Sequence, residues 1–143
     1  MSAAPKKGNL VLQIAGRALA KMDVVGKSDP YLNIYRIVDG KRELIHKTEI
    51  IKVTLDPIWE PISIPSDKLG KMDPADTLVF ECWDWDKASA DDLIGETTMT
   101  LGALMDPDMV IVLDLINKDK VGKKDYKNSG VLAFTKHEFV PEA

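Results

Sequence analysis

Two short stretches of the sequence concentrate carboxylates in a pattern that suits a hard metal cation. Asp23 and Asp29 lie in MDVVGKSDPY, and WDWDKASADDLIGE holds Asp84, Asp86 and Asp92. Carboxylate oxygens are hard ligands, and Ca²⁺ takes about six to eight oxygens in flexible geometry. Two unit charges about 4 Å apart repel by roughly 4 kcal/mol at an effective dielectric of about 20, so such a cluster is unfavourable without a cation. If the two stretches meet, they predict a calcium site.

Each stretch reads as a loop that leads into a strand. Gly, Ser and Asp turn residues are followed by an apolar run, YLNIY in the first stretch and LIGE in the second. The lysines that offset the negative charge within the two loops are Lys21, Lys27 and Lys87. The alternative is that these are turn aspartates only, because Asp side chains in loops commonly bond nearby backbone amides. For any single aspartate that alternative is the better explanation.

Short apolar runs between turn signals predict an all-β sandwich for the rest of the chain. The eight expected antiparallel strands are residues 10–14, 31–38, 43–52, 59–64, 77–83, 93–101, 110–116 and 131–139. Asp39-Gly40 predicts a hairpin turn, since both residues tolerate the positive φ of tight hairpins. Residues 66–72 are expected to form one helical turn with Ser66 as its N-cap, and residues 101–105 a short helix.

The order of these strands would bring the aspartates together. In an up-and-down sequence of strands, the loops at 21–28, 53–59 and 84–92 follow the first, third and fifth strands and lie at one end. An even number of strands places both termini at the opposite end. Both aspartate stretches are therefore expected at a shared rim, as a common site requires.

The composition fits one ordinary globular domain. The chain has 143 residues, 45% of them hydrophobic and 29% charged, and a sandwich of this kind needs roughly 100 residues. We expect a polar lead-in at residues 1–8 and a single domain at residues 9–140. No apolar run is long enough to span a bilayer, and the start lacks the apolar stretch of a signal peptide. The lone Cys82 falls on the core-facing side of its strand, which fits a reducing, cytosolic setting.

The formal net charge of −4 disfavours nucleic-acid partners, which usually require a basic stripe. It also disfavours a permanently basic membrane-docking surface. Two bound Ca²⁺ ions would bring the net charge from −4 to zero, which would remove most of the repulsion from an acidic bilayer. A calcium-dependent switch is therefore physically reasonable.

Several motifs, taken in order, resemble a known family. SDPYL, TLDPIWEP, ECWDWD and DLIGE together strongly resemble the C2 domain, a calcium- and phospholipid-binding β-sandwich. IYRIVDG, LIHKTEIIK, LDPIWEP and KKDYKNSG are most similar to the C2 domains of copines, and the likeness runs from about Leu10 to Phe139. Copines carry two C2 domains and a larger C-terminal domain, whereas this chain has room for one C2 domain. One strand before the first aspartate loop and a closing Gly130-Val131-Leu132 strand match the permuted, type II form.

The resemblance implies a ligand set residue by residue. Asp23 and Asp29 match the ligands of the first calcium loop, and Asp84, Asp86 and Asp92 match those of the last loop. The resemblance also implies that two ions are held, that Asp29 and Asp86 bridge them, and that further oxygens come from the backbone of Met22, Trp85 and Ala90 and the hydroxyl of Ser89. Asp91 is expected to be a solvated extra acid or a competing ligand. Five aspartates in family register make the turn-only alternative the weaker one.

Membrane contacts are implied at the loop tips. Val24 and Val25 occupy the tip of the first loop, and Trp85 either inserts at the last loop or packs on its scaffold. Lys52 and Lys87 match positions that contact phosphatidylserine in related C2 domains, although each could equally be a solvated surface lysine. Polyphosphoinositide selectivity is not expected, because non-basic residues stand at two concave-face positions where lysines occur in relatives. Those two residues are Asn33 and Glu49.

The remaining residues have simpler explanations. We expect Tyr31, Tyr35, Trp59 and Trp83 to be packing residues, and the two histidines, His46 and His137, to lie at the surface or at strand edges. No nucleophile–base pair, phosphate-cradling glycine loop or activated thiol indicates an enzyme. The prediction is calcium-dependent binding to anionic phospholipid membranes, phosphatidylserine first, by a cytoplasmic protein recruited when calcium rises. The alternative is a C2-type protein-interaction module that binds a partner through a strand edge or the hairpin near Asp39.

Overall fold

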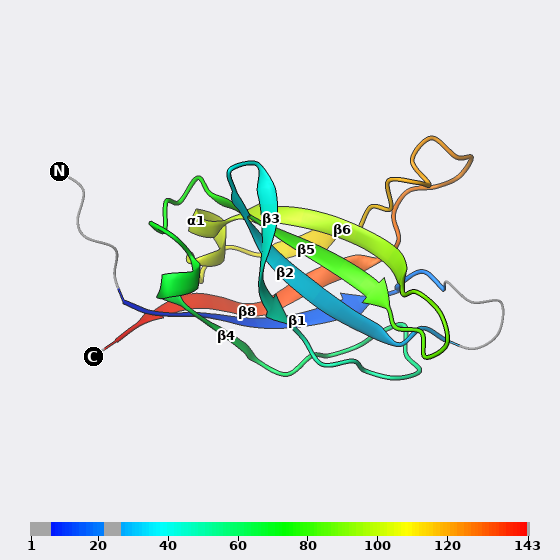
Figure 1. The fold of residues 1–143 in the computed structure, drawn as a ribbon, viewed down its shortest axis with the longest axis horizontal. Helices are drawn as coiled ribbons and strands as arrows, with labels where there is room; N and C mark the ends of the chain where they lie inside the picture. Colours follow the sequence, from blue (N-terminus) through cyan, green and yellow to red (C-terminus); the bar gives the residue numbers. More distant parts are fainter. Residues whose placement is uncertain (1–6, 22–26, 143) are drawn as a thin grey trace.

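The computed structural model describes residues 7–21 and 27–142, and within them eight strands form two antiparallel sheets packed face to face (Figure 1). The first sheet, in the order β4-β1-β8-β7, consists of β1 (Gly8–Arg17), β4 (Ile62–Pro65), β7 (Ile111–Asp114) and β8 (Val131–Pro141). The second sheet, in the order β3-β2-β5-β6, consists of β2 (Pro30–Val38), β3 (Lys41–Lys47), β5 (Thr77–Asp84) and β6 (Asp92–Thr100). The predicted all-β, eight-stranded sandwich is confirmed.

Alternating side chains from both sheets fill the space between them. On β5, Leu78, Phe80 and Cys82 face inward and are buried, as the spacing of two in the sequence predicts. The ring of Phe80 meets that of Phe134 on the opposite sheet edge-on, with 5.1 Å between centroids. The expected core position of Cys82 is confirmed, and burial raises the pKa of its thiol, with Asp84 adding to the shift. This thiol is therefore an inert core group.

Two strand boundaries differ from the expected ones. The third strand ends at Lys47 instead of residue 52, because the hydroxyl of Thr48 accepts the Leu32 N–H at 2.8 Å. The fourth strand begins at Ile62 instead of residue 59, because Pro61 has no N–H to donate; the Trp59 N–H still donates to the Ile14 carbonyl of β1.

Both short helices appear, but one cap was predicted wrongly. The 3₁₀ helix η1 (Ser66–Lys68) follows Pro65 at its N-cap without a side-chain cap, and the Ser66 hydroxyl instead accepts the Gly8 N–H at 3.2 Å. The helix α1 (Leu101–Leu104) is capped by Thr100, whose hydroxyl oxygen accepts the Ala103 N–H at 3.3 Å. Ser66 therefore ties the helical turn to β1 and does not cap it.

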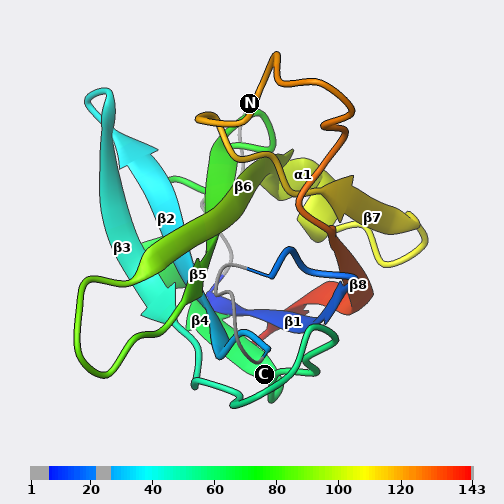
Figure 2. The same ribbon diagram turned by 90° about the vertical axis from the view of Figure 1, so that its right-hand side faces the viewer.

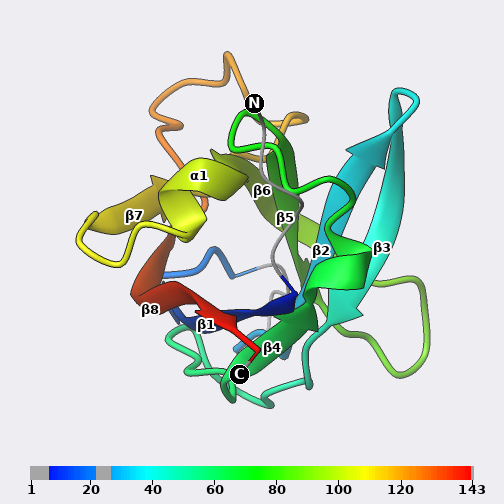
Figure 3. The same ribbon diagram turned by 90° about the vertical axis from the view of Figure 1, so that its left-hand side faces the viewer.

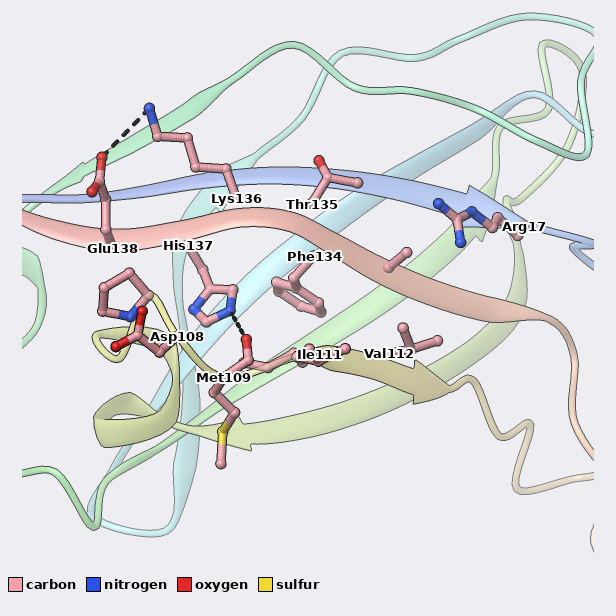
Figure 4. Close-up of a pocket in the computed structure, with 13 residues that line it drawn as sticks. Arg17, Asp108, Met109, Ile111, Val112, Phe134, Thr135, Lys136, His137 and Glu138 are labelled. Carbon is pink, nitrogen blue, oxygen red and sulfur yellow. Dashed lines mark hydrogen bonds and ion pairs between the residues drawn. The ribbon is translucent and has the colours of Figure 1, made fainter.

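His137 is buried, so the prediction that it lies at the surface is wrong. Opposite Gln13 and Ile14 the register of β8 shifts, which leaves Thr135 as the extra residue of a β-bulge and turns His137 inward. Its ring lies between two backbone carbonyls, with Nδ1 3.1 Å from the Leu104 oxygen and Nε2 2.6 Å from the Met109 oxygen. Figure 4 shows the second of these contacts. Carbonyl oxygens only accept, so the ring nitrogen that carries a proton is the donor in these contacts. His137 thus fixes the connection between α1 and β7.

The segments that follow β1, β3, β5 and β7 gather at one end of the sandwich, which Figure 2 views end-on. At the other end, seen in Figure 3, β1 begins beside the end of β8, and Gly8 pairs with Pro141. The expected separation of the loop rim from the strand ends nearest the two termini is therefore confirmed. Among the described residues, no helix has the length and apolar character needed to cross a bilayer.

Candidate metal centre

Asp84 and Asp29 meet at the loop rim because the ladder between β2 and β5 places them there. The inward alternation of β5 continues past Cys82 to Asp84, which is only 2% exposed. Asp84 lies opposite Pro30 in the register, and its Oδ1 accepts the Asp29 N–H at 2.9 Å. Two of the predicted ligand residues are thus joined directly.

Asp92 adds a carboxylate from the neighbouring strand. It is the first residue of β6 and lies opposite Asp84 in the register, beyond a bulge between Cys82 and Trp83. Its side chain is exposed, whereas that of Asp84 is buried. Asp29, which directly precedes β2, and Asp84 and Asp92 on β5 and β6 therefore place three carboxyl groups at one end of the sheet.

Asp86 organises the loop between β5 and β6. Its Oδ1 accepts the backbone N–H groups of Ala88 at 2.8 Å and Ser89 at 3.1 Å. These contacts lower the pKa of Asp86, the Ala88 N–H contributing most, followed by the Ser89 side chain and backbone. The carboxylate therefore stays charged below the ordinary range of an aspartate. A carboxylate has about four lone-pair sites on its two oxygens, so the turn leaves room for a further ligand.

Asp91 has a structural role in the loop that the sequence did not reveal. Its carboxylate accepts hydrogen bonds from the Tyr31 hydroxyl and from the Asp86 N–H, the latter at 2.9 Å. The expectation of a solvated acid is therefore wrong. Burial raises the pKa of Tyr31, and the contact with Asp91 raises it further, so the hydroxyl remains a donor. Asp91 fixes the backbone at Asp86 and is a positioning residue.

We expect Tyr31→Phe to loosen this loop and to lower the free energy of unfolding by about 1–2 kcal/mol, because it removes a donor to a charged acceptor. Urea denaturation measures the stability, and amide exchange at Asp86 measures the loop. Tyr35→Phe makes the same chemical change on the same strand but away from this loop. If the two variants speeded exchange at Asp86 equally, the proposed role of the Tyr31–Asp91 contact would be refuted.

Asp29 connects three parts of the rim. Besides the bond from its N–H to Asp84, its carbonyl accepts the Trp85 N–H at 3.1 Å. Its Oδ1 accepts the Val53 N–H at 2.7 Å, from the segment between β3 and β4. Hydrogen bonds that orient a ligating carboxylate are a usual part of a metal site. Asp29 is thus held in a fixed orientation by groups that need not leave when a cation binds.

The residues expected to contact lipid are also at this rim. The ammonium of Lys52 lies 5.1 Å from the centroid of the Trp85 ring, an arrangement typical of a cation–π contact. Lys52 is exposed and Trp85 is half-buried, so both side chains are at least partly accessible at this rim. Lys87, Ser89 and Ala90 are exposed on the same loop as Trp85.

Four of the predicted site residues, Met22, Asp23, Val24 and Val25, lie outside the described residues. Within residues 7–21 and 27–142, no group of three or more His, Cys, Asp or Glu side chains is arranged to hold a metal ion. Asp29, Asp84 and Asp92 nevertheless lie at the same end of the sheet, and carboxylates are the hard oxygen donors that calcium prefers. The complete ligand set remains a prediction.

The outer face of the second sheet carries paired charges. Glu81 accepts the Trp83 Nε1–H at 2.9 Å and pairs with Arg42, which also pairs with Glu96 at 2.6 Å. Lys47 lies over the ring of Tyr31 at 4.8 Å. Glu81, a buried acid paired with Arg42, occupies this face.

Comparison with known proteins agrees with this architecture. Residues 10–115 match the C2 domain family. The chain is 37% identical over 153 residues to nicotinic receptor-associated protein 1 of Caenorhabditis elegans, covering 96% of this chain and 24% of that protein. It is 35% identical over 126 residues to Copine-D of Dictyostelium discoideum, covering 88% of this chain and 23% of that protein. The chain therefore spans about a quarter of the length of these curated relatives.

Solved structures share the fold. BON1-C2B superposes with a TM-score of 0.74 at 24% identity, covering 94% of this chain and 93% of that one. A C2 domain of plant extended synaptotagmin 1 gives a TM-score of 0.68 at 20% identity, covering 99% of both chains. The predicted resemblance to C2 domains, and to copines in particular, is confirmed.

Proposed function

We propose that this chain, which belongs to the C2 domain family and is similar to copines, binds anionic phospholipid membranes in a calcium-dependent manner. The observation that carries the proposal is the placement of three aspartates at one end of the sheet, where the Asp29 N–H bonds Asp84 and Asp92 lies opposite Asp84. A buried carboxylate beside further acids is costly without a cation. Family membership makes calcium the cation to test first.

The residues that would hold two Ca²⁺ ions are those of the predicted set. Asp29, Asp84, Asp86 and Asp92 would act with Asp23, the backbone carbonyls of Met22, Trp85 and Ala90, and the Ser89 hydroxyl. The bound ions would supply positive charge and open positions for headgroup oxygens. Asp91 and the Val53 N–H would orient the carboxylates of the site through Asp86 and Asp29.

Electrostatics favours phosphatidylserine over more highly charged lipids. Two Ca²⁺ would bring the net charge of −4 to zero and so remove the repulsion from an acidic bilayer. Lys52 and Lys87 would each add about 1 kcal/mol near an anionic surface. Arg42 is already neutralised by two glutamates, so the outer sheet face offers little to a polyphosphoinositide.

The finer structural and cellular expectations belong to the same proposal. We infer a type II strand order, because the first aspartate loop follows β1 and the last strand, β8, pairs with β1. Residues 9–140 would act as the C2 domain, cytoplasmic at resting calcium and recruited to a membrane surface when calcium rises. Membrane signalling or trafficking is the corresponding role.

A protein-interaction module is the second candidate, supported by the open edge of the first sheet. β7 is an edge strand in which Val112 is exposed, and Met109 and Val110, which directly precede it, are exposed as well. A hollow of about 420 Å³ lies beside it, bordered by Arg17, Lys136 and residues of the α1–β7 connection (Figure 4). An extended peptide could add to such an edge.

Co-sedimentation with vesicles tests the first proposal. We expect the protein to pellet with phosphatidylserine vesicles in calcium, and to stay in the supernatant in chelator or with phosphatidylcholine alone. By linkage, these vesicles should raise the calcium affinity by the same factor by which calcium raises lipid affinity. No pelleting under any condition would refute membrane binding. In that case a pull-down without lipid should be tried. If it retains a protein partner, and if Val112→Asp abolishes that binding, the protein-interaction candidate is favoured.

A further inference from the structure

Val53 has a backbone conformation that β-branched residues rarely adopt. Its φ is +58°, in the left-handed region, where valine is disfavoured by the contacts of its branched side chain. Its side chain is 66% exposed, so core packing does not account for the choice of valine. An exposed and disfavoured residue of this kind indicates a role outside the fold.

Hydrogen bonds explain the backbone at Val53 but not its side chain. The Val53 N–H donates to Asp29 Oδ1 at 2.7 Å, and the next N–H, of Thr54, donates to the Ser28 carbonyl at 2.9 Å. These two bonds hold the turn against the segment that precedes β2. Glycine or asparagine would make the same bonds with less steric conflict. What valine adds is an isopropyl group pointing into solvent.

The neighbours of Val53 suit a lipid surface. Lys52 precedes it in the chain and is exposed, with its ammonium over the Trp85 ring. The apolar side chain of Val53 suits the boundary of the acyl chains in a bilayer. The Lys52 ammonium and the Trp85 indole beside it suit the headgroup layer. All three lie at the rim that holds the candidate calcium ligands.

We propose that Val53 is a membrane-contact residue that inserts shallowly into an anionic bilayer from the segment between β3 and β4. This inference rests on the proposed function, because the acidic rim repels such a bilayer until cations neutralise it. Lys52 would pair with lipid phosphate next to the inserted valine. With this contact, the membrane-binding surface would include the segment between β3 and β4 in addition to the two aspartate loops.

Other exposed valines provide matched controls. Val110 is 90% exposed but lies before β7, at the end of the sandwich opposite the calcium rim. Val121 is 62% exposed in the segment between β7 and β8, at the same rim. Neither has a positive φ, so neither shows the conformational conflict seen at Val53.

A probe at position 53 tests insertion directly. Val53→Cys can be labelled with an environment-sensitive fluorophore, because the natural Cys82 is fully buried. With vesicles of phosphatidylserine and phosphatidylcholine in calcium, we expect a blue-shifted emission that is quenched by shallow nitroxide lipids. The label at Val110→Cys should remain in water, and chelator should reverse the change at position 53.

Substitution tests the contribution to affinity. Val53→Asn keeps the N–H and tolerates the left-handed backbone, so it should leave the fold intact and weaken vesicle binding by about tenfold, the effect of partly burying one valine. Val110→Asn should leave binding unchanged. Val53→Gly should raise the melting temperature without lipid, which tests the conformational conflict separately.

The outcomes separate this inference from the proposed function. If the wild-type protein binds the vesicles but the label at position 53 stays in water, or Val53→Asn binds normally, the inference is wrong and the proposed function stands. Equal weakening by Val53→Asn and Val110→Asn would also overturn it. If the wild-type protein binds no vesicles in calcium, both proposals fall.

Discussion

Replacing Asp84 and Asp86 together by asparagine should abolish calcium-triggered binding to phosphatidylserine vesicles, with a loss in calcium response of at least about 100-fold, or roughly 2.7 kcal/mol. Asparagine has nearly the shape of aspartate and keeps an oxygen that can accept a hydrogen bond. The Asp29 N–H can therefore still donate at position 84, and the Ala88 and Ser89 N–H groups at position 86. What disappears is the charge that attracts the cation.

The sign of the effect distinguishes ligation from simple electrostatics. The double substitution changes the net charge from −4 to −2, which by itself should make the protein bind an anionic bilayer better. A loss of binding therefore identifies the two carboxylates as calcium ligands. Binding in chelator is expected to stay absent or to rise slightly.

A control pair makes the same charge change elsewhere. Asp67 and Asp108 are exposed in η1 and in the α1–β7 connection, away from the loop rim. Asp67→Asn with Asp108→Asn should leave calcium-triggered pelleting unchanged. Vesicle sedimentation across a calcium titration, with melting temperatures for every variant, makes the measurement. Normal binding by the Asp84 and Asp86 double variant would refute the calcium site proposed here.

Periodicity and turn chemistry made much of the fold predictable. The spacing of Leu78, Phe80 and Cys82 defines an inward face that continues to Asp84, and this is why the acid is buried at the rim. Asp39 and Gly40 both have positive φ, +51° and +76°, as their hairpin requires. Because successive antiparallel strands alternate in direction, counting strands was enough to place the aspartate loops at one end.

Features that depend on distant partners were not predictable. Tyr31 and Asp91 are 60 residues apart, and no local pattern indicates that the hydroxyl of one bonds the carboxylate of the other. His137 was expected at the surface or at a strand edge. A regular alternation from Phe134 would indeed point it outward, but one bulged residue reverses the side. Such bulges have no reliable signal in a single sequence.

The conformation at Val53 was missed for a different reason. Turn prediction depends on Gly, Asn and Asp, which adopt positive φ at low cost, and valine is the opposite kind of residue. Its conformation follows from bonds to Asp29 and Ser28, which precede it by more than twenty positions. The turn rules therefore fail at Val53. This residue lies at the rim, where we propose that function, and not stability, selected valine.

Phe80→Ala should be the most damaging single core substitution in stability, lowering the free energy of unfolding by about 3–5 kcal/mol. Phe80 is 0% exposed on the central strand β5 and packs edge-on against Phe134 of the other sheet, with an interplanar angle of 83°. Its removal opens a cavity between the sheets and also removes an aromatic contact, which contributes about 0.5–1.5 kcal/mol beyond burial. Calorimetry should show a melting temperature lower by roughly 10–15 °C.

Comparison variants separate the cavity from the ring contact. Phe80→Leu keeps most of the volume and should cost about 1–2 kcal/mol. A double-mutant cycle with Phe134→Leu should recover the ring–ring term as a coupling energy of about 1 kcal/mol. Because the rim is held by its own hydrogen bonds around Asp29 and Asp84, Phe80→Ala should bind calcium normally well below its melting temperature. A calcium affinity that fell with stability at low temperature would instead mean that the core and the rim are energetically coupled.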